Sequence, residues 1–422
     1  MSSYRSLARN HDFTALWIGQ TASTLGSRMS MFVFPLLAYA LTGSALTAAL
    51  AEALHLLGLA GTLLPAGVVA DRVDRRLVMR TASGAGVLLY ASLAAAGIAG
   101  HLTTAHLLVV ALLSGVCAGA FAPSETSAVR TVVPRDDLPT ALAQNQAREH
   151  VAGLLGAPLG GALYAAARWA PFAADAVTYA VSWVLLGRIR TDLSPTPYDG
   201  PRRRVRDDLG AGARFVLGHP LFRTLLCWSA LTNLVVNALF FVAVLRLIED
   251  GVDPVHLGLV ETTAGAAGIL GAVLAPWIME RFATGWLTIT IAWSFLPVLV
   301  PLALWNSPVV VAATLAFTLL LNPAGNAGMG AYRLAVTPSE LVGRAQSFSQ
   351  FASMSAMPLA PVVAGTSLAL LGGTGAVVVL GALVAVTALI PTLSATVRAV
   401  PRPAVWRAEA EVTLAPAAKV PA

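Results

Sequence analysis

Seven ionisable side chains interrupt stretches of the sequence that are otherwise strongly apolar. They are Arg28, Glu52, His55, Arg148, Glu149, Asp175 and Glu261. An ionisable group among apolar helices is costly, so it is a functional candidate by default. Because burial raises the pKa of a carboxyl group, such a group can exchange protons near neutral pH. These residues therefore indicate proton coupling, and we expect at least one carboxyl group to titrate during the working cycle.

The same residues have a static interpretation, in which opposite charges pair and hold neighbouring helices together. Arg28 could pair with Glu52, and Arg148 with a carboxylate on another helix. Glu52 and His55 are three residues apart and share one helical face. Asp175 could instead lie near a helix N-terminus, where the backbone stabilises an anion. The sequence leaves the static and the proton-carrying interpretations open.

Six amide side chains form three pairs with a spacing of four residues. The pairs are Asn233 and Asn237, Asn322 and Asn326, and Gln346 and Gln350. This spacing places both members on one helical face, where they can line a solvated cavity or bond to a neighbouring helix. Aromatic residues that could add apolar walls are Trp17, Phe32, Phe34, Phe240 and Phe241. Together they predict a large, mostly apolar cavity that suits a bulky amphiphile better than a sugar.

The composition predicts the elements that must position these residues. The chain has 422 residues, of which 57% are hydrophobic and 11% charged, and its mean hydropathy is +0.74. Soluble domains carry about 25% charged residues. No Asp, Glu, Lys or Arg lies between Arg80 and Glu125, between Arg281 and Arg333, or between Arg344 and Arg398. Each gap accommodates two helices of about 20 residues, the length that crosses a bilayer core, so we expect an all-α membrane protein.

We expect twelve transmembrane helices in two pseudo-symmetric halves of six. The expected spans are 13–41, 46–70, 77–100, 105–123, 138–167, 171–187, 221–247, 255–279, 286–305, 309–329, 341–371 and 376–393. Residues 1–12 form a cytoplasmic N-terminus, 13–190 the N-terminal half, 191–219 a cytoplasmic linker, 220–396 the C-terminal half and 397–422 a disordered cytoplasmic tail. The linker sequence allows a short interfacial helix over 211–217.

Basic residues indicate the orientation. Of the 27 Lys and Arg residues, all but Arg28, Arg148, Arg168 and Arg246 fall in turns and tails on one side. Positively charged loops stay in the cytoplasm, so both termini are predicted to be cytoplasmic and the protein to lie in an inner, or plasma, membrane. The same distribution argues against nucleic acid as a partner.

The two halves carry traces of an internal repeat. Glu52, Asp71 and Arg72 recur at one constant spacing as Glu261, Glu280 and Arg281. Parallel repeats of this kind occur in transporters whose substrate site lies between the halves, near the bilayer midplane.

A compact charged turn joins the second and third expected spans. Residues 67–76 read G-V-V-A-D-R-V-D-R-R, which resembles the signature loop of the major facilitator superfamily, with Asp74 where many members have Gly. The resemblance implies the major facilitator fold and a latch that closes the two halves on the cytoplasmic side. The latch residues here would be Gly67, Asp71, Arg72, Arg75 and Arg76, with Ser339-Glu340 as partner. In the alternative, the turn only marks the cytoplasmic side.

The fifth expected span carries small residues around a proline. Gly153, Ala157, Pro158 and Gly161 resemble the antiporter motif of exporters in this superfamily, with Ala in place of two of its glycines. Small residues four apart also let helices approach closely, so close packing alone is the alternative.

The N-terminal stretch resembles one branch of the superfamily. Asn10, Phe13, Gly19 and Gly26, with their neighbours, resemble the branch that holds macrolide efflux pumps and the enterobactin exporter. Members often carry Asp after the glycine equivalent to Gly26, where this chain has Ser27. A proton carrier at this position of the first span is therefore absent, so coupling must use another residue or be of a different kind.

This drug:proton antiporter resemblance implies a secondary transporter that exports lipophilic small molecules, such as drugs, antibiotics or siderophore-like natural products. Export would proceed by alternating access, with the proton gradient as energy source and no cofactor or metal. The expected partners are the lipid bilayer, the small-molecule substrate and protons, and we expect a monomer. The sequence contains no H-E-x-x-H, G-x-S-x-G or Walker A pattern, so we expect no enzyme. The alternatives are a nutrient or metabolite uptake carrier of the same fold and a non-transporting membrane scaffold.

Overall fold

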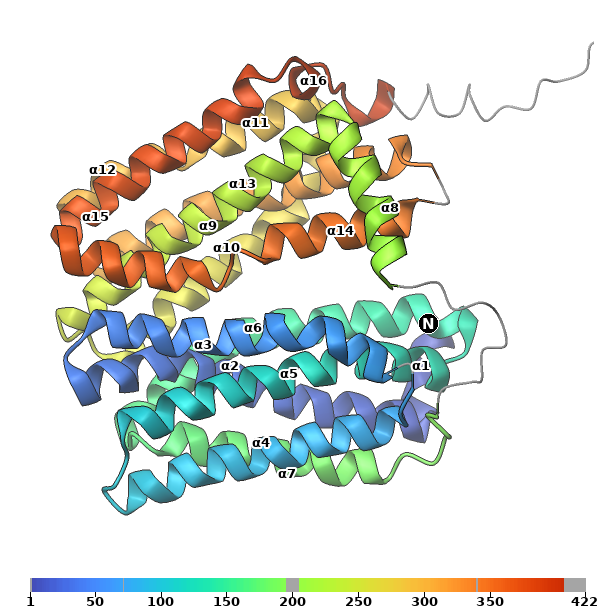
Figure 1. Cartoon of the computed structure of the whole chain (residues 1–422), viewed down its shortest axis with the longest axis vertical. Helices are drawn as coiled ribbons and strands as arrows, with labels where there is room; N and C mark the ends of the chain where they lie inside the picture. Colours follow the sequence, from blue (N-terminus) through green and yellow to red (C-terminus); the bar gives the residue numbers. More distant parts are fainter. Residues whose placement is uncertain (1, 71, 195–204, 339–340, 406–422) are drawn as a thin grey trace, which may run out of the picture. The chain divides into compact units, whose positions relative to one another are not determined.

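The computed structural model describes residues 2–70, 72–194, 205–338 and 341–405, and every regular element within these ranges is a helix (Figure 1). The first elements are α1 (Ser2–Arg9), α2 (His11–Thr42), α3 (Ala45–Ala70), α4 (Arg75–Ile98), α5 (Thr104–Val132), the 3-10 helix η1 (Arg135–Asp137), α6 (Leu138–Ala166) and α7 (Ala170–Gly187). Then follow α8 (Val205–Gly218), α9 (Pro220–Glu249), α10 (Pro254–Arg281), α11 (Thr284–Ser294), α12 (Leu299–Leu304), α13 (Pro308–Val336), α14 (Val342–Met354), α15 (Leu359–Leu393) and α16 (Ala395–Arg398). The predicted all-α fold is confirmed.

The helices account for twelve membrane crossings. Within the described residues, ten helical segments are long and apolar enough to cross a membrane. The charged helix α6, with 29 residues, is long enough for one further crossing. The segment Arg344–Leu393 counts as one of the ten but is 50 residues long, and its backbone breaks at Gly372, where φ is 68°. It therefore provides two crossings.

Polar side chains fix several helix starts. Asn10 accepts a hydrogen bond from the backbone N–H of Phe13 at 3.0 Å and so caps α2. Thr103 and Ser307 cap α5 and α13 in the same way. Such caps satisfy N–H groups that have no partner inside the helix. At the other end of α2, Gly43 takes the left-handed conformation, with φ 64°, that commonly ends a helix.

Several differences between the observed helices and the expected spans lie at proline residues. Span 286–305 is broken into α11 and α12, with Pro297 between them, and span 341–371 is broken before Pro358. Proline removes a backbone donor and clashes with the preceding turn. The fourth span, predicted to end at residue 123, instead continues through Pro123 to the end of α5. The helix predicted over 211–217 is part of α8, whereas residues 195–204 and 406–422 lie outside the described residues.

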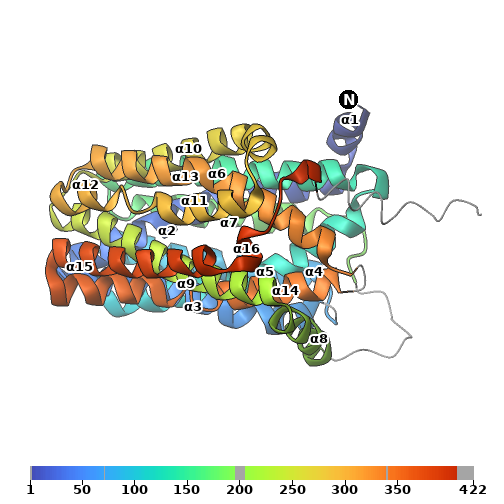
Figure 2. The same ribbon diagram turned by 90° about the horizontal axis from the view of Figure 1, so that it is seen from above.

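The chain packs into two compact units. The first comprises Met1–Asp199, Phe241–Thr262 and Pro358–Gly372, and the second Gly200–Phe240, Thr263–Met357 and Gly373–Ala422. Within the first unit, the helices α2 to α7 run along a common direction (Figures 1 and 2), with α3 packed against α5, α2 against α6 and α7, and α4 against α7. This unit also holds the end of α9 and the start of α10, which contribute residues to the site below.

Small residues allow the closest helix contacts in the first unit. A side chain at Gly58 of α3 would meet the backbone of Leu112, and one at Gly115 of α5 would meet the carbonyl of His55. Beside this contact, Phe34 and Tyr90 stack with ring centroids 6.3 Å apart. The interior of this unit is therefore closely packed and rich in aromatic residues.

Backbone contacts near helix ends and a side-chain hydrogen bond hold helices of the second unit together. Gly212 of α8 lies against the backbone of Arg344 near the start of α14. The N–H of Gly285 at the start of α11 bonds to the carbonyl of Val400 at 3.1 Å. Trp293 of α11 donates to the Thr392 hydroxyl of α15 at 2.9 Å.

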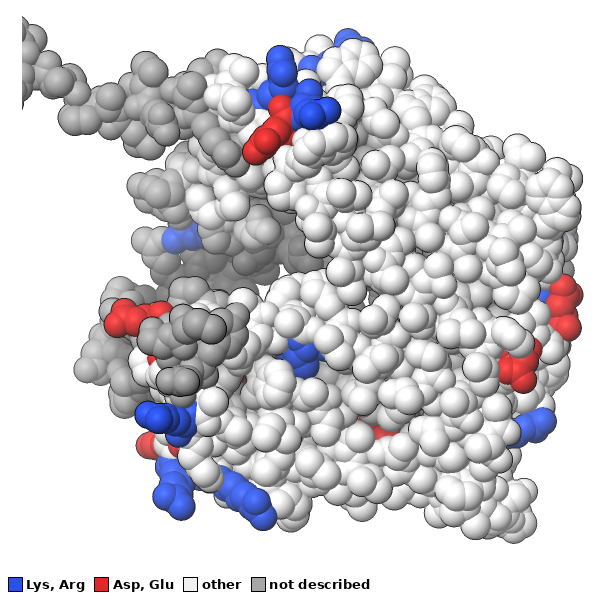
Figure 3. Space-filling view, turned by 180° about the vertical axis from the view of Figure 1, so that it is seen from behind, with Lys and Arg blue, Asp and Glu red and all other residues white. Residues whose placement is uncertain are grey.

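Large apolar side chains cover the exposed parts of the helices. Leu88, Val309 and Leu370 are 73%, 77% and 83% exposed. On the face drawn in Figure 3, uncharged side chains make up most of the surface. Extensive exposed apolar surface is a property of membrane contact rather than of a soluble domain.

Candidate functional site

A cavity of about 190 Å³ in the first unit brings together three of the ionisable residues singled out in the sequence. Arg28 comes from α2, Glu52 from α3 and Glu261 from α10. The remaining lining is apolar and consists of Met31, Phe32, Pro35, Phe241, Val244, Ile248 and Leu257. One guanidinium and two carboxyl groups therefore face a mostly apolar space, and two of the predicted aromatic residues form part of its wall.

Small residues of α6 place this helix directly against the cavity walls. A side chain at Gly156 would collide with Arg28, and one at Gly161 with the backbone of Pro254. The start of α10 approaches the same surface, since a side chain at Gly258 would meet Ala157 and Pro158.

Three of the four residues that resemble the antiporter motif thus contact the start of α10. The exception is Gly153, which has open space beside it. Next to Glu261, the hydroxyl of Thr262 donates to the carbonyl of Leu154 at 3.2 Å. This bond fixes the part of α10 that carries the cavity carboxyl group against α6.

A row of alternating charges extends from the cavity into the unit. Arg28 lies 3.3 Å from Glu149 of α6, whose other oxygen lies 3.3 Å from Arg148. Arg148 in turn lies 2.9 Å from Glu125 of α5. The Arg148 side chain is only 4% exposed, so its charge is compensated by the two glutamates rather than by water.

Glu125 is not among the site residues expected from the sequence. The fourth expected span ends at residue 123, which would place Glu125 outside the membrane. Instead α5 continues to Val132 and carries Glu125 within the helix. The signal that could have found it is that residues 126–132 contain no Gly or Pro and only one charged residue, Arg130, so the helix can continue.

The cavity and the row of charges together contain more carboxyl groups than guanidinium groups. Two arginines, Arg28 and Arg148, face four glutamates, at positions 52, 125, 149 and 261. With all six groups ionised the site is negatively charged, so it can take up protons or attract a cation. Among the described residues, no group of three His, Cys, Asp or Glu side chains is arranged to hold a metal ion.

His55 and Asp175 lie away from this cavity. His55 is 7% exposed, and its Nδ1 lies 3.0 Å from the Ser114 hydroxyl of α5. Asp175 is fully buried in α7 and accepts a hydrogen bond from Thr178 at 3.0 Å. A side chain at Gly26 would collide with Asp175, so α2 and α7 are in direct contact there. These two residues belong to the interior of the first unit.

The residues of the charged loop occupy different environments. Asp71 and the proposed partner Ser339-Glu340 lie outside the described residues, Gly67 has open space beside it, and Arg72 is exposed. The Arg75 N–H bonds to the carbonyl of Leu193 at 3.5 Å. Arg76 donates to the carbonyl of Thr191 at 2.5 Å.

Asp74, which stands where the resembled signature has Gly, is the N-cap of α4. It accepts a hydrogen bond from the backbone N–H of Arg76 at 2.9 Å. The departure from the signature therefore has a local structural role.

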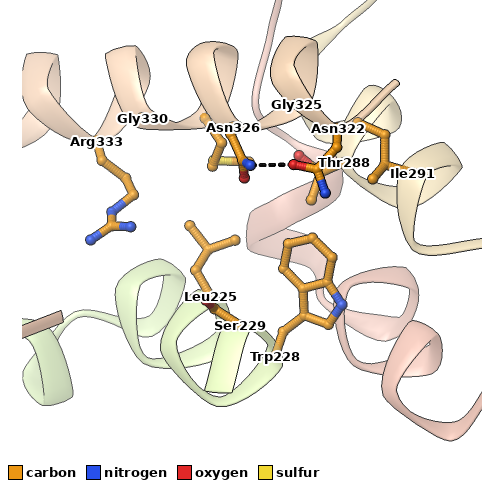
Figure 4. Close-up of a pocket in the computed structure, with 11 residues that line it drawn as sticks. Leu225, Trp228, Ser229, Thr288, Ile291, Asn322, Gly325, Asn326, Gly330 and Arg333 are labelled. Atoms are coloured by element: carbon orange, nitrogen blue, oxygen red, sulfur yellow. Dashed lines mark hydrogen bonds between the residues drawn. The ribbon is translucent and has the colours of Figure 1, made fainter. Parts of the chain in front are cut away.

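One of the three amide pairs lines a cavity of the second unit, and another forms hydrogen bonds along its own helix. Asn326 donates to Asn322, and both line a second cavity, of about 100 Å³ (Figure 4). Asn237 donates to the backbone carbonyl of Asn233 at 2.7 Å, and the Asn233 side chain donates to Ser229 at 3.4 Å.

The third pair, on α14, is exposed. Gln350 donates to the sulfur of Met354 at 3.2 Å, and Gln346 lies one turn before it.

The sequence of residues 16–284, more than half of the chain, matches the family model described as Major Facilitator Superfamily. The chain belongs to this superfamily. The resemblance carried by residues 67–76 is confirmed at that level, whereas the antiporter branch stays a prediction. Among curated protein sequences, none matches this superfamily member significantly.

Solved structures of transporters share the fold. A bacterial homologue of the human lysosomal transporter Spinster, inward-facing and unoccupied, is 15% identical over 91% of this chain and 96% of its own, with a TM-score of 0.69. A bacterial homologue of the iron transporter ferroportin is 16% identical over 92% and 98%, also with a TM-score of 0.69. A mutant of the nucleoside transporter NupG is 13% identical over 90% and 99%, with a TM-score of 0.65. The family and these neighbours are membrane transporters and not enzymes.

Proposed function

We propose that this superfamily member exports lipophilic small molecules, such as drugs, antibiotics or siderophore-like natural products, by alternating access coupled to proton antiport. The observation that carries the proposal is the cavity in which Glu52 and Glu261, from two distant parts of the sequence, face Arg28 within an apolar wall. The wall suits a lipophilic body, and the carboxyl groups suit a proton or a cationic group.

Arg28 links the cavity to the row of ion pairs. When both cavity carboxyl groups are ionised, the lining carries one more negative than positive charge. Arg28 also contacts Glu149, so it is attracted from two sides. Because Coulomb interactions are strong in a medium of low dielectric constant, protonation of Glu52 or Glu261 would shift Arg28 toward Glu149. A proton and a cationic substrate would thus compete for the same carboxyl groups, which is the requirement for antiport.

The proposal places the protein in the plasma membrane, with both termini in the cytoplasm and the monomer as the working unit. The distribution of Arg over the turns supports this orientation. The loop containing Asp71 acts as the cytoplasmic latch. Asp71→Asn is then expected to impair turnover while leaving membrane insertion normal, whereas a scaffold would tolerate the change.

The first test measures transport in cells. Accumulation of a panel of antibiotics, dyes and siderophores is compared in cells with and without the protein. Export predicts lower accumulation of at least one lipophilic compound when the protein is present. Higher accumulation would support the uptake carrier, and an unchanged panel would contradict the export proposal.

The second test measures coupling with the exported compound. Purified protein in liposomes with an internal pH-sensitive dye should move protons when that compound is added. Glu52→Gln and Glu261→Gln should each reduce this proton movement by about tenfold or more. Glu249→Gln is the matched control, because Glu249 is exposed at the end of α9 and does not line the cavity. Transport without proton movement, or equal rates in all three variants, would refute the coupling.

A further inference from the structure

The second cavity, of about 100 Å³, lies entirely within the second unit. Residues of α9, α11 and α13 line it, and Figure 4 shows Asn322, Asn326 and Arg333 along one side of α13 with Trp228 of α9 opposite. The spacing of these three residues along α13 places them on one helical face. The lining also includes the apolar side chains of Leu225, Ile291 and Met329.

Arg333 is the charged residue of this lining. Its guanidinium lies 5.5 Å from the centre of the Phe222 ring, and its Nε is buried without a hydrogen-bond partner in the part of the chain that the structure describes. None of the ion pairs formed by the described residues includes Arg333. Arginine stays protonated in proteins and has five donors, so this half-buried guanidinium has donors available to an anionic acceptor.

The neighbouring groups suit an anionic acceptor. Asn326 donates one hydrogen to Asn322, which leaves further amide hydrogens beside the cavity. Gly330, one helical turn before Arg333, has open space where a side chain would stand. The cavity is thus open next to the guanidinium, polar along α13 and apolar elsewhere.

We propose that this cavity binds the oxyanion group of an amphiphile, a carboxylate or a phosphate attached to an apolar ring or chain. Arg333 is the counter-ion, the amides of Asn322 and Asn326 donate hydrogen bonds, and the apolar part lies against Trp228 and Met329. A single guanidinium matches a single negative charge, and a cavity of about 100 Å³ has room for a carboxylate or phosphate group. The site is independent of the proposed export function.

The test uses Trp228 as an internal reporter. Purified protein in nanodiscs of neutral phosphatidylcholine is titrated with 4-bromobenzoate, whose bromine quenches tryptophan fluorescence. In a second arm, phosphatidylglycerol with brominated chains replaces phosphatidylcholine with the same brominated chains. Trp228→Phe identifies the part of the quenching that belongs to this residue.

Saturable quenching of Trp228 is expected in at least one arm. A response to 4-bromobenzoate alone assigns the site to a soluble carboxylate, and a response to phosphatidylglycerol alone assigns it to a membrane lipid. Arg333→Gln should weaken binding at least tenfold and Arg333→Lys less than Arg333→Gln, while Gly330→Leu should abolish binding by filling the space.

Arg281→Gln is the matched control, because Arg281 ends α10 in the same unit, contacts Trp277 and does not line the cavity. Quenching that is absent in both arms, or that is equal in wild type and the Arg333→Gln and Gly330→Leu variants, would overturn the proposal. Arg333→Lys and Gly330→Leu both keep a basic residue at position 333. The test therefore does not depend on the folding of Arg333→Gln alone.

Discussion

Arg148 of α6 and Glu125 of α5 form an ion pair of 2.9 Å, with the two side chains only 4% and 17% exposed. The pair joins two helices of the first unit through charges that are largely removed from water. Arg148 also contacts Glu149 at 3.3 Å. It therefore connects Glu125 to the part of the row that begins at Arg28. Its removal is therefore expected to affect both stability and the charge balance of the cavity.

Arg148→Met should destabilise the protein strongly, because it leaves Glu125 with no counter-ion in a buried position. Removing one partner of a buried pair costs about 3–5 kcal/mol, whereas replacing both by apolar residues is often nearly neutral. The midpoint of thermal unfolding in detergent should thus fall far more for Arg148→Met than for the double variant Arg148→Met, Glu125→Leu. Arg168→Met, at an exposed arginine, is the control. A double variant as unstable as the single one would contradict this interpretation.

Asp12→Asn should loosen the segment that follows α7. The Asp12 carboxylate accepts hydrogen bonds from the N–H of Arg190 at 3.0 Å and from the N–H and hydroxyl of Thr191 at 2.7 and 2.6 Å. Hydrogen bonds to a charged group contribute roughly 1.5–3 kcal/mol, and an amide replaces one acceptor oxygen by a donor. Hydrogen exchange at the two N–H groups should become faster, with Arg9→Gln, at an exposed residue near the end of α1, as the control. Unchanged exchange would show that these bonds do not hold the segment.

Gly161→Ala and Gly153→Ala should have opposite effects, although both lie in the stretch that resembles the antiporter motif. A methyl group at Gly161 would collide with the backbone of Pro254, while Gly153 faces open space. Overpacking costs typically about 1–3 kcal/mol, and Ala in place of Gly inside a helix gains up to about 1 kcal/mol. The unfolding midpoint should fall for the first variant and stay or rise for the second. Equal effects would show that the contact with α10 is unimportant for packing.

Gly372→Ala should destabilise the turn between the last two membrane crossings. Gly372 has φ 68° and ψ 173°, a region that only glycine occupies readily and that costs another residue about 1–3 kcal/mol. Gly373→Ala is the control, since Gly373 lies next to Gly372 but is helical and has no positive φ. Limited proteolysis at this turn, compared between the two variants, measures the effect. Equal cleavage would mean that the conformation is not required.

The sequence by itself determined the approximate position of the long apolar helices and indicated the superfamily. The reason is that the bilayer imposes both length and composition: a crossing needs about 20 apolar residues, and its backbone must be satisfied within the helix. The caps at Asn10 and Ser307 are equally local, because each acts within three residues of the chain. Proline was less informative, since the helix breaks beside Pro297 but continues through Pro123.

Only the tertiary structure decided which charged residues meet. Glu52, Glu261 and Arg28 share a cavity, while His55, one helical turn from Glu52, contacts the Ser114 hydroxyl instead. Such choices depend on how each helix is rotated and how closely its neighbours approach. Glycines such as Gly156, which contact helices far away in the chain, set these two quantities. A local pattern gives the spacing of residues along one helix but not the face that a distant helix covers, so the cavity and the row of ion pairs required the folded chain.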